Sequence, residues 1–130
     1  MTAIPNALDI NTWSPIEQSV ARKLLHLPQD VPLLLFGAMG GTRDPRKGFK
    51  LLKASLDSLR GELLGLELVV FGQHAHKLPM DLGFPAHYTG HLHDEIALRL
   101  LYSAADAMVI PSRQDNLPNT GLESHACGTP

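Results

Sequence analysis

Short, β-prone segments that end at glycine or proline alternate along this chain with longer segments whose apolar residues recur at helical spacing. The short segments predict buried strands at 33–36, 66–71, 86–89 and 107–110. Such alternation is typical of parallel βαβ units, in which a helix follows each strand and crosses back over the sheet. The pattern therefore predicts an α/β fold with a partial, doubly wound parallel sheet.

The longer segments predict the helices between these strands. Ser14 and Pro15 fit an N-cap followed by proline at the first helical position, which predicts a helix over 15–26. Its apolar stripe would consist of Ile16, Val20, Leu24 and Leu27. The next stripe consists of Phe49, Leu52, Leu56 and Leu59. Asp94 is expected to cap a third helix, with Ile96, Leu100 and Leu101 among its apolar positions. A fourth helix should follow the strand at 107–110.

Composition and charge narrow the classes of protein to consider. The chain has 130 residues, of which 44% are hydrophobic and 18% charged, so it reads as one globular domain at 15–130 preceded by an irregular entry segment at 1–14. A formal charge of −2 without a basic run argues against a nucleic-acid partner. Cys127 is the one cysteine and cannot form an internal disulfide, in keeping with a reducing compartment. We expect a protein of the cytoplasm, or one at the inner face of the membrane.

Glycine and basic residues gather in the loop that follows the first predicted strand. Glycine lets backbone amides approach a pyrophosphate, and cationic side chains can pair with its oxygens. The residues with this chemistry are Gly40, Gly41, Arg43, Arg46 and Lys47. The loop matches neither a Walker motif nor Gly-x-Gly-x-x-Gly. From these residues alone, a solvated basic loop that caps a helix is an equally good interpretation.

Two acids, Asp115 and Glu123, bracket the predicted start of the last helix. A helix N-terminus offers unpaired amides and the positive end of a dipole, which suit a phosphate, and Glu123 could bind a sugar hydroxyl beside it. Further amides and a hydroxyl for phosphate would come from Asn119, Thr120 and Gly121. An isolated pair of acids at such a place more often only stabilises the helix dipole. The loops after all the predicted strands should nevertheless meet at one edge of the sheet, where ligands bind in this class of fold.

Several ordered segments carry a family resemblance. Residues 111–123, with Asn-Leu-Pro-Asn-Thr between the two acids, resemble the paired-glutamate motif of type-B-fold retaining glycosyltransferases of the glycogen and sucrose synthase-like family. Within that family they are similar to the bacterial exopolysaccharide branch that makes colanic acid. Residues 4–9 resemble the crossover into the family's C-terminal domain, 46–49 its phosphate-side loop, and 102–106 the lead to its Pro-Ser. Ala38 stands where many members carry arginine, and Asp115 where they usually carry glutamate.

The resemblance implies the Rossmann-like half of the type-B fold and roles for named residues. It implies that Glu123 binds the ribose hydroxyls, Asp115 the hydroxyls of the transferred sugar and Lys47 the diphosphate, and these three are the candidate catalytic residues. It places the nucleotide base beside His91 and Leu92. A nucleotide-diphosphate sugar would be the donor substrate, with no separate cofactor. We expect no metal site, because the pairs at 74/76 and 91/93 lack the spacing of two ligands on one helix face.

The function expected from the resemblance is donor binding in a hexosyltransferase of polysaccharide biosynthesis that retains anomeric configuration. The acceptor, a glycan or a lipid-linked sugar, would bind to a separate N-terminal domain of a longer chain. We expect the present chain to be a C-terminal domain that is incomplete at its own C-terminus and inactive alone. An unpaired apolar edge at 107–110 would favour self-association. A nucleotide-sugar epimerase of the same fold and a non-catalytic nucleotide-binding module remain as alternatives.

Overall fold

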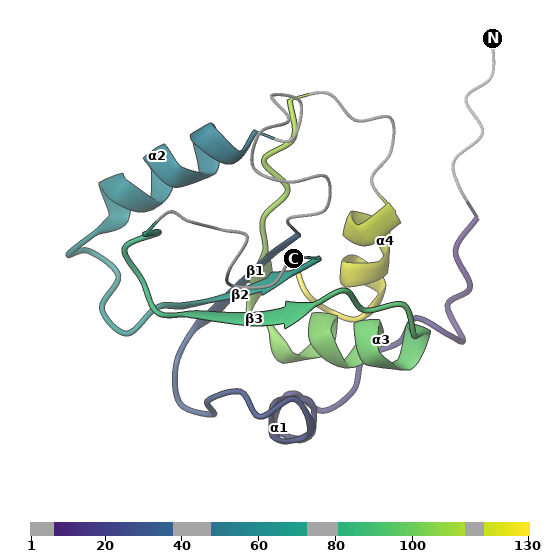
Figure 1. Ribbon diagram of the computed structural model, residues 1–130. Helices are drawn as coiled ribbons and strands as arrows, with labels where there is room; N and C mark the ends of the chain where they lie inside the picture. Colours follow the sequence, from purple (N-terminus) through teal and green to yellow (C-terminus); the bar gives the residue numbers. More distant parts are fainter. Residues whose placement is uncertain (1–6, 38–47, 73–80, 114–118) are drawn as a thin grey trace, which may run out of the picture.

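A computed structural model describes residues 7–37, 48–72, 81–113 and 119–130 (Figure 1). Within these residues strands and helices alternate as the sequence predicts. The strands are β1 (Leu33–Gly37), β2 (Glu67–Phe71), β3 (Ala86–Gly90) and β4 (Ala107–Met108). The helices are α1 (Gln18–Leu24), α2 (Phe49–Leu59), α3 (Glu95–Ala104) and α4 (Asn119–Ala126). Among the described residues, no helix is both long enough and apolar enough to cross a membrane.

The strands form one parallel sheet in the order β3-β2-β1-β4. Leu34 of β1 is in register with Leu68 of β2 on one side and with Ala107 of β4 on the other. The connections through α2 and α3 lead to opposite sides of β1, so the sheet is wound in both directions from that strand. The predicted α/β fold with a doubly wound parallel sheet is therefore confirmed.

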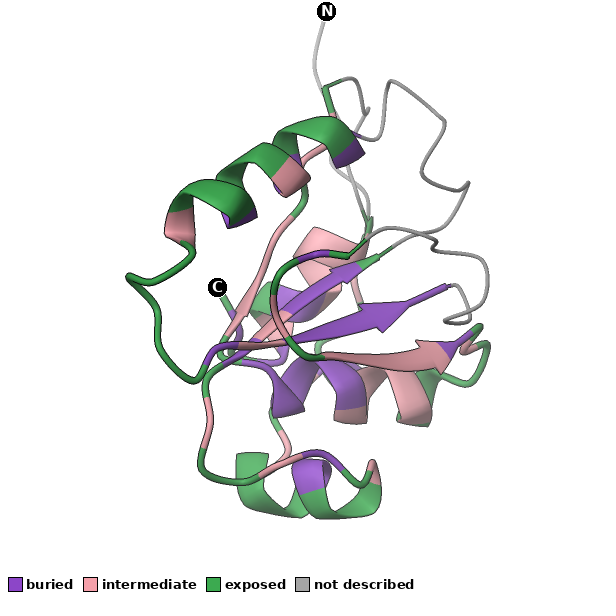
Figure 2. Cartoon of the chain, turned by 60° about the vertical axis from the view of Figure 1, so that its left-hand side comes forward, coloured by how far each residue is buried: buried purple, intermediate pink, exposed green. Residues whose placement is uncertain are grey.

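Both faces of the sheet are buried, because alternate residues of each central strand enter different cores. Helix α2 covers one face, while α1 and α3 lie on the other (Figures 1 and 2). On the α2 face the buried residues are Phe36, Phe49, Leu52, Leu56, Leu66, Leu68, Val70 and Leu82. On the opposite face they include Trp13, Ala21, Leu33, Leu35, Val69, Phe71, Leu101, Tyr102 and Cys127. This two-sided burial explains why the central strands read as continuous apolar runs.

The first helix differs from its prediction in both length and orientation. It begins after Glu17, which makes no side-chain cap, and not at Pro15. Val20 and Leu24, expected in the apolar stripe, are 43% and 60% exposed. The residues that α1 buries are Ala21 and Arg22, at 0% and 3% exposure. The helix buries an arginine in preference to two aliphatic residues because the guanidinium is hydrogen-bonded to acceptors inside the protein.

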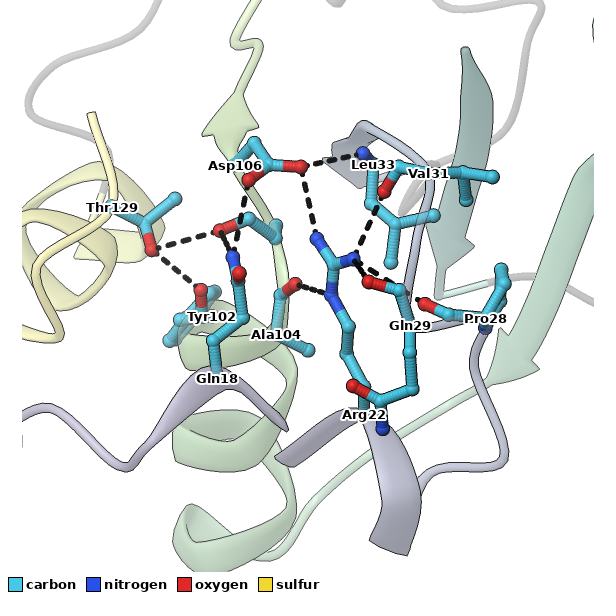
Figure 3. Close-up of polar contacts among 11 residues, drawn as sticks. Gln18, Arg22, Pro28, Gln29, Val31, Leu33, Tyr102, Ala104, Asp106 and Thr129 are labelled. Carbon is cyan, nitrogen blue, oxygen red and sulfur yellow. Dashed lines mark hydrogen bonds and ion pairs between the residues drawn. The ribbon is translucent and has the colours of Figure 1, made fainter. Parts of the chain in front are cut away.

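Some of those acceptors follow α1 closely, and others come from the distant end of α3 and the start of β4 (Figure 3). Arg22 Nε donates to the carbonyl of Ala104 at 2.8 Å, and a second nitrogen donates to the carbonyl of Val31 at 2.9 Å. Its remaining nitrogen pairs with Asp106 Oδ2 at 2.9 Å, and the same oxygen accepts from the Leu33 amide at 2.8 Å. Arg22 thus joins α1 to the amino-terminal ends of both β1 and β4.

Strand β4 is shorter than the predicted 107–110 and comprises Ala107 and Met108 alone. The amide of Val109 still donates to Leu35 at 2.8 Å, but Ile110 is exposed. The chain leaves the sheet there to bring Pro111 against the start of α2. The outward amide of Met108 donates to the carbonyl of Pro130 at 2.7 Å, so the edge of β4 is partly covered.

The third helix follows its prediction closely at its start. Asp94 adopts an extended conformation, and its carboxylate accepts a hydrogen bond from the Ile96 amide at 2.9 Å. Leu101 is buried as expected, whereas Ile96 is 66% exposed. The N-cap was predictable because it depends on neighbouring residues alone. The exposure of Ile96 depends on where the rest of the fold lies.

Candidate functional site

The strands β1 and β4 pair side by side in parallel, so their carboxyl-terminal ends lie at the same edge of the sheet. In doubly wound sheets ligands bind at this edge. A close backbone contact lies there. Gly48 has φ 67°, and a Cβ atom on it would stand 1.7 Å from the carbonyl oxygen of Pro111. The start of α2 and the loop after β4 therefore touch, which a side chain at residue 48 would prevent.

The candidate site residues divide into two sets. Outside the described residues lie Gly40, Gly41, Arg43, Arg46, Lys47 and Asp115. The described ones are His91, Leu92, Asn119, Thr120, Gly121 and Glu123. All members of the second set follow β3 or β4 in the chain.

Helix α4 places Asn119, Thr120 and Gly121 in its first turn, as predicted. Asn119 is exposed, and the next two residues are half-buried. The amides of a first helical turn have no acceptor within the helix, so they can bind an anion. Glu123 follows one turn later and is half-buried on the same helix. An anion-binding helix start and a carboxylate thus lie close together on one element.

The carboxylate of Glu123 is held by the hydroxyl of Tyr102, which donates to Oε2 at 2.8 Å. Tyr102 comes from α3 and is completely buried. Burial raises the pKa of Glu123, the hydrogen bond from Tyr102 lowers it, and the negative charge of Glu95 raises it, with a net increase. Burial and the adjacent Glu123 raise the pKa of Tyr102 far above its usual range, so the hydroxyl keeps its proton. The tyrosine is a permanent donor to this acid.

Glu123 also lines a cavity of about 390 Å³ between α4 and the entry segment. The cavity is lined by Ala7, Leu8, Asp9, Trp13, Asn119, Leu122 and Glu123. The carboxylate of Asp9 accepts hydrogen bonds from the Asn11 amide and the Thr12 hydroxyl, each at 2.9 Å. Both oxygens of Asp9 thus hold the local turn. A carboxylate, an amide side chain and apolar walls together can bind a polyhydroxylated ring with an apolar face.

Sequence reasoning missed two features of this region. It named no site residue in the entry segment, yet Ala7, Leu8, Asp9 and Trp13 form one wall of the cavity. It also gave Tyr102 no role. The available signal was a hydroxyl on the apolar side of a predicted helix, since a buried tyrosine usually needs a partner for its O–H.

A second cavity, of about 590 Å³, lies at the opposite edge of the sheet. It is bounded by the segment before β2, including Arg60 and Leu64, and by the segment before β3, including Asp81 and Phe84. The strands begin at this edge, and its described lining includes none of the candidate site residues.

Comparison with known protein families shows which family this chain belongs to. Residues 32–130 match the family described as glycosyl transferases group 1. The chain belongs to this family. The matched range contains every strand and the paired-acid segment, and it begins after α1.

Relatives within and near the family support the assignment. A D-inositol 3-phosphate glycosyltransferase of Xylanimonas cellulosilytica is 32% identical over 98% of this chain and 33% of its own length. D-inositol 3-phosphate glycosyltransferase 1 of Catenulispora acidiphila is 31% identical over 95% of this chain and 32% of its own length. The chain therefore spans about a third of the length of the curated relatives it matches.

Solved structures of glycosyltransferases share the fold. Sucrose-phosphate synthase from Thermosynechococcus elongatus superposes with a TM-score of 0.71 at 26% identity, over 98% of this chain and 33% of that one. WaaG, a glycosyltransferase involved in lipopolysaccharide biosynthesis, gives 0.66 at 27% identity, over 87% of this chain and 31% of that one. These neighbours confirm the Rossmann-like half of a type-B glycosyltransferase fold.

The segment after β3, predicted to border the base, contacts the core of this group 1 glycosyltransferase domain through Leu92. Leu92 packs against the same core cluster as Tyr102, and His91 is exposed. The rings of His91 and His93 are nearly parallel, with centroids 6.1 Å apart. In the described part of the chain, no group of three or more histidine, cysteine, aspartate or glutamate residues is arranged to hold a metal ion.

Proposed function

We propose that this chain is the donor-binding part of a glycosyltransferase that moves a hexose from a nucleotide-diphosphate sugar to a glycan or lipid-linked acceptor with retention of configuration. Family membership supports sugar transfer. The observation that carries donor binding is the carboxylate of Glu123, fixed beside an anion-binding helix start and facing a cavity at the carboxyl edge of the sheet. In this proposal residues 1–14 are an entry segment and residues 15–130 are the nucleotide-sugar-binding domain.

In this proposal each part of the nucleotide sugar contacts a different segment of the chain. Glu123 accepts hydrogen bonds from the ribose hydroxyls, and the segment at 91–92 borders the base. The amides of Thr120 and Gly121 contact the diphosphate, with Asn119 beside them. From the loop after β1, Lys47 and the arginines 43 and 46 add positive charge, and glycines 40 and 41 allow close approach. Asp115 binds the transferred sugar. Charge that develops on the leaving diphosphate is then stabilised electrostatically.

The acceptor in this proposal binds to a part of the parent protein outside the present chain. The relatives carry different acceptors or products in their names, namely D-inositol 3-phosphate, sucrose phosphate and lipopolysaccharide. A region shared by such different enzymes suits the common donor better than the differing acceptors. We propose that the parent protein acts in polysaccharide synthesis of the exopolysaccharide branch, in the cytoplasm or at the inner face of the membrane. Closure of this domain onto the acceptor-binding part would complete the site.

Nuclear magnetic resonance titration of the 130-residue chain with UDP, GDP and ADP tests this proposal. At least one nucleotide should shift resonances in 38–48, 90–93 and 115–123 together, because in this proposal all three segments contact the bound nucleotide. The bound nucleotide should also raise the free energy of unfolding by about 2.7 kcal/mol at a hundred times its dissociation constant. Shifts confined to other segments, or no shifts at millimolar nucleotide, would contradict donor binding.

A further inference from the structure

The contact between Tyr102 and Glu123 joins two helices whose packing fixes both partners. The phenol ring of Tyr102 lies edge-on to Phe71 with centroids 6.2 Å apart, and its centroid is 5.8 Å from that of Trp13. Phe71 ends β2, and Trp13 belongs to the entry segment. The ring is therefore held by the sheet and by the entry segment, and its hydroxyl reaches α4 from a rigid base.

Only one oxygen of the acid takes part in this contact. Among the described residues, the single hydrogen bond of the Glu123 carboxylate is the one from Tyr102 to Oε2. The same side chain borders the cavity beneath the entry segment. A carboxylate that is bonded through one oxygen keeps the other oxygen for donors that enter the cavity, such as a pair of adjacent sugar hydroxyls.

We propose that Tyr102 is a positioning residue for nucleotide binding, whose buried hydroxyl fixes Oε2 of Glu123 and so presents Oε1 to the ribose. This inference rests on the proposed function for the role of Glu123. It assigns Tyr102 no contact with substrate. Its effect reaches the nucleotide through the geometry and the charge of the glutamate.

The charges around Glu123 show why such a donor matters. Burial and the negative Glu95 of α3 both raise the pKa of the acid, and the Tyr102 hydroxyl opposes them. In the described part of the chain, the other ionisable groups near Glu123 are Asp9 across the cavity, Arg99 on α3 and Cys127 just after α4. Without the hydroxyl, the glutamate would take up a proton at higher pH and would lose its capacity as an ionic acceptor there.

Tyr102→Phe is the matched test, because it removes the hydroxyl and keeps the ring against Phe71. The variant should bind UDP, GDP or ADP, whichever the wild-type chain binds, on the order of tenfold more weakly at a pH close to the raised pKa of Glu123. The loss should shrink as the pH is raised further, because Glu123 then becomes ionised in both proteins. Tyr88→Phe is the control, since Tyr88 is the chain's other tyrosine and packs in the core of the opposite face. It should bind like wild type.

A double-mutant cycle separates positioning from general loosening of the core. In a Glu123→Gln background, the Tyr102→Phe change should cost clearly less affinity than it costs in wild type, because its effect passes through the ionised glutamate. An equal loss in both backgrounds, uniform across pH, would overturn the inference and leave Tyr102 with a structural role.

Carbon-13 titration of the Glu123 carboxyl gives a readout that needs no nucleotide. Tyr102→Phe should raise the pKa of this carboxyl, whereas an unchanged pKa would overturn the inference. Fluorotyrosine incorporated in a Tyr88→Phe chain labels Tyr102 alone and makes it a stronger donor, so it should lower the same pKa without removing any contact. If wild type bound no nucleotide while these shifts appeared, the proposed function would fail and the Tyr102–Glu123 coupling would stand.

Discussion

Gly48 approaches Pro111 so closely that a Cβ atom on the glycine would lie 1.7 Å from the proline carbonyl oxygen. The two residues stand 63 positions apart (111 − 48), one at the start of α2 and the other after β4. Their contact holds the start of α2 against the segment that follows β4. Backbone is unable to retreat as a flexible side chain would, so the contact requires glycine.

Gly48→Ala should therefore destabilise the protein by roughly 1–3 kcal/mol and weaken nucleotide binding. Both the positive φ and the clash with Pro111 contribute to the expected loss. Gly65→Ala is the matched control, because Gly65 has φ 81° but nothing within 4 Å of its added Cβ. It should cost about 1 kcal/mol from backbone conformation alone. Denaturant unfolding of both variants measures the difference, and equal losses would show that the Pro111 contact adapts.

Glu123→Gln should weaken nucleoside diphosphate binding by roughly 1–3 kcal/mol, since the neutral amide is a poorer acceptor for ribose hydroxyls. Because the pKa of Glu123 is raised in the folded protein, wild-type affinity should fall as the pH drops through that raised value. Affinity of the variant should not show this fall. Isothermal titration across pH checks both statements, and unchanged affinity at neutral pH would leave Glu123 with helix-dipole stabilisation only.

The same substitution should stabilise the folded chain slightly at neutral pH. A carboxyl whose folded pKa lies above its unfolded value destabilises the fold progressively as pH rises from the unfolded value to the folded one. Above its raised folded pKa the ionised Glu123 carries that cost in full, and glutamine removes it. Thermal unfolding at about pH 7 and pH 4 tests the sign, because the advantage of Glu123→Gln should vanish at the lower pH.

How far the sequence predicts this structure depends on how local each cause is. The strand at 33–36 and the cap at Asp94 follow from neighbouring residues and were confirmed. The prediction of which face α1 buries was wrong. Burial of Arg22 depends on carbonyls near residues 31 and 104, which the spacing of apolar residues in the helix does not reveal. In the site, α4 and its acid could be predicted from motif and spacing. The Tyr102 hydroxyl and the entry-segment wall depend on packing between remote elements.

Arg22→Met should destabilise the chain by about 3–5 kcal/mol, because it leaves Asp106 and several inward carbonyls without their buried donor. Lys23→Met, one residue along the same helix and exposed, is the control and should change stability by less than about 0.5 kcal/mol. Chemical denaturation of the two variants gives the comparison. A small loss at Arg22 would mean that water replaces the guanidinium.

Asp106 should contribute to acid sensitivity through the same network. Partial burial raises its pKa, but hydrogen bonds from the Leu33 amide and Gln18 and the charge of Arg22 outweigh burial and lower it below the usual value. Its stabilisation is therefore present above the unfolded pKa of 3.8 and is lost as pH falls through the lowered folded value. Asp106→Asn should unfold with a weaker dependence on pH below about 4, measured by urea unfolding. An unchanged dependence would place the acid-sensitive groups elsewhere.

The outer edge of β4 should promote self-association of the 130-residue chain, although the Met108 amide is already bonded to Pro130. Ile110, 37% exposed just beyond the strand, extends this apolar edge. Ile110→Lys should reduce association by adding a charge at the edge. Sedimentation velocity over a range of concentrations measures both chains. A wild-type chain that remains monomeric at all concentrations would show that the Pro130 contact protects the edge.

The buried Arg22 also affects the order in which parts of the domain can fold during synthesis. Arg22 Nε bonds to a carbonyl 82 residues later, and its salt-bridge partner follows 84 residues later. On the ribosome, α1 and the nearby carbonyls that bond to one guanidinium nitrogen are made long before Ala104 and Asp106, so Nε and the remaining nitrogen stay hydrated until the chain has reached β4. The first helix to be translated is among the last to be locked in place, so folding of this domain is completed from its C-terminal side.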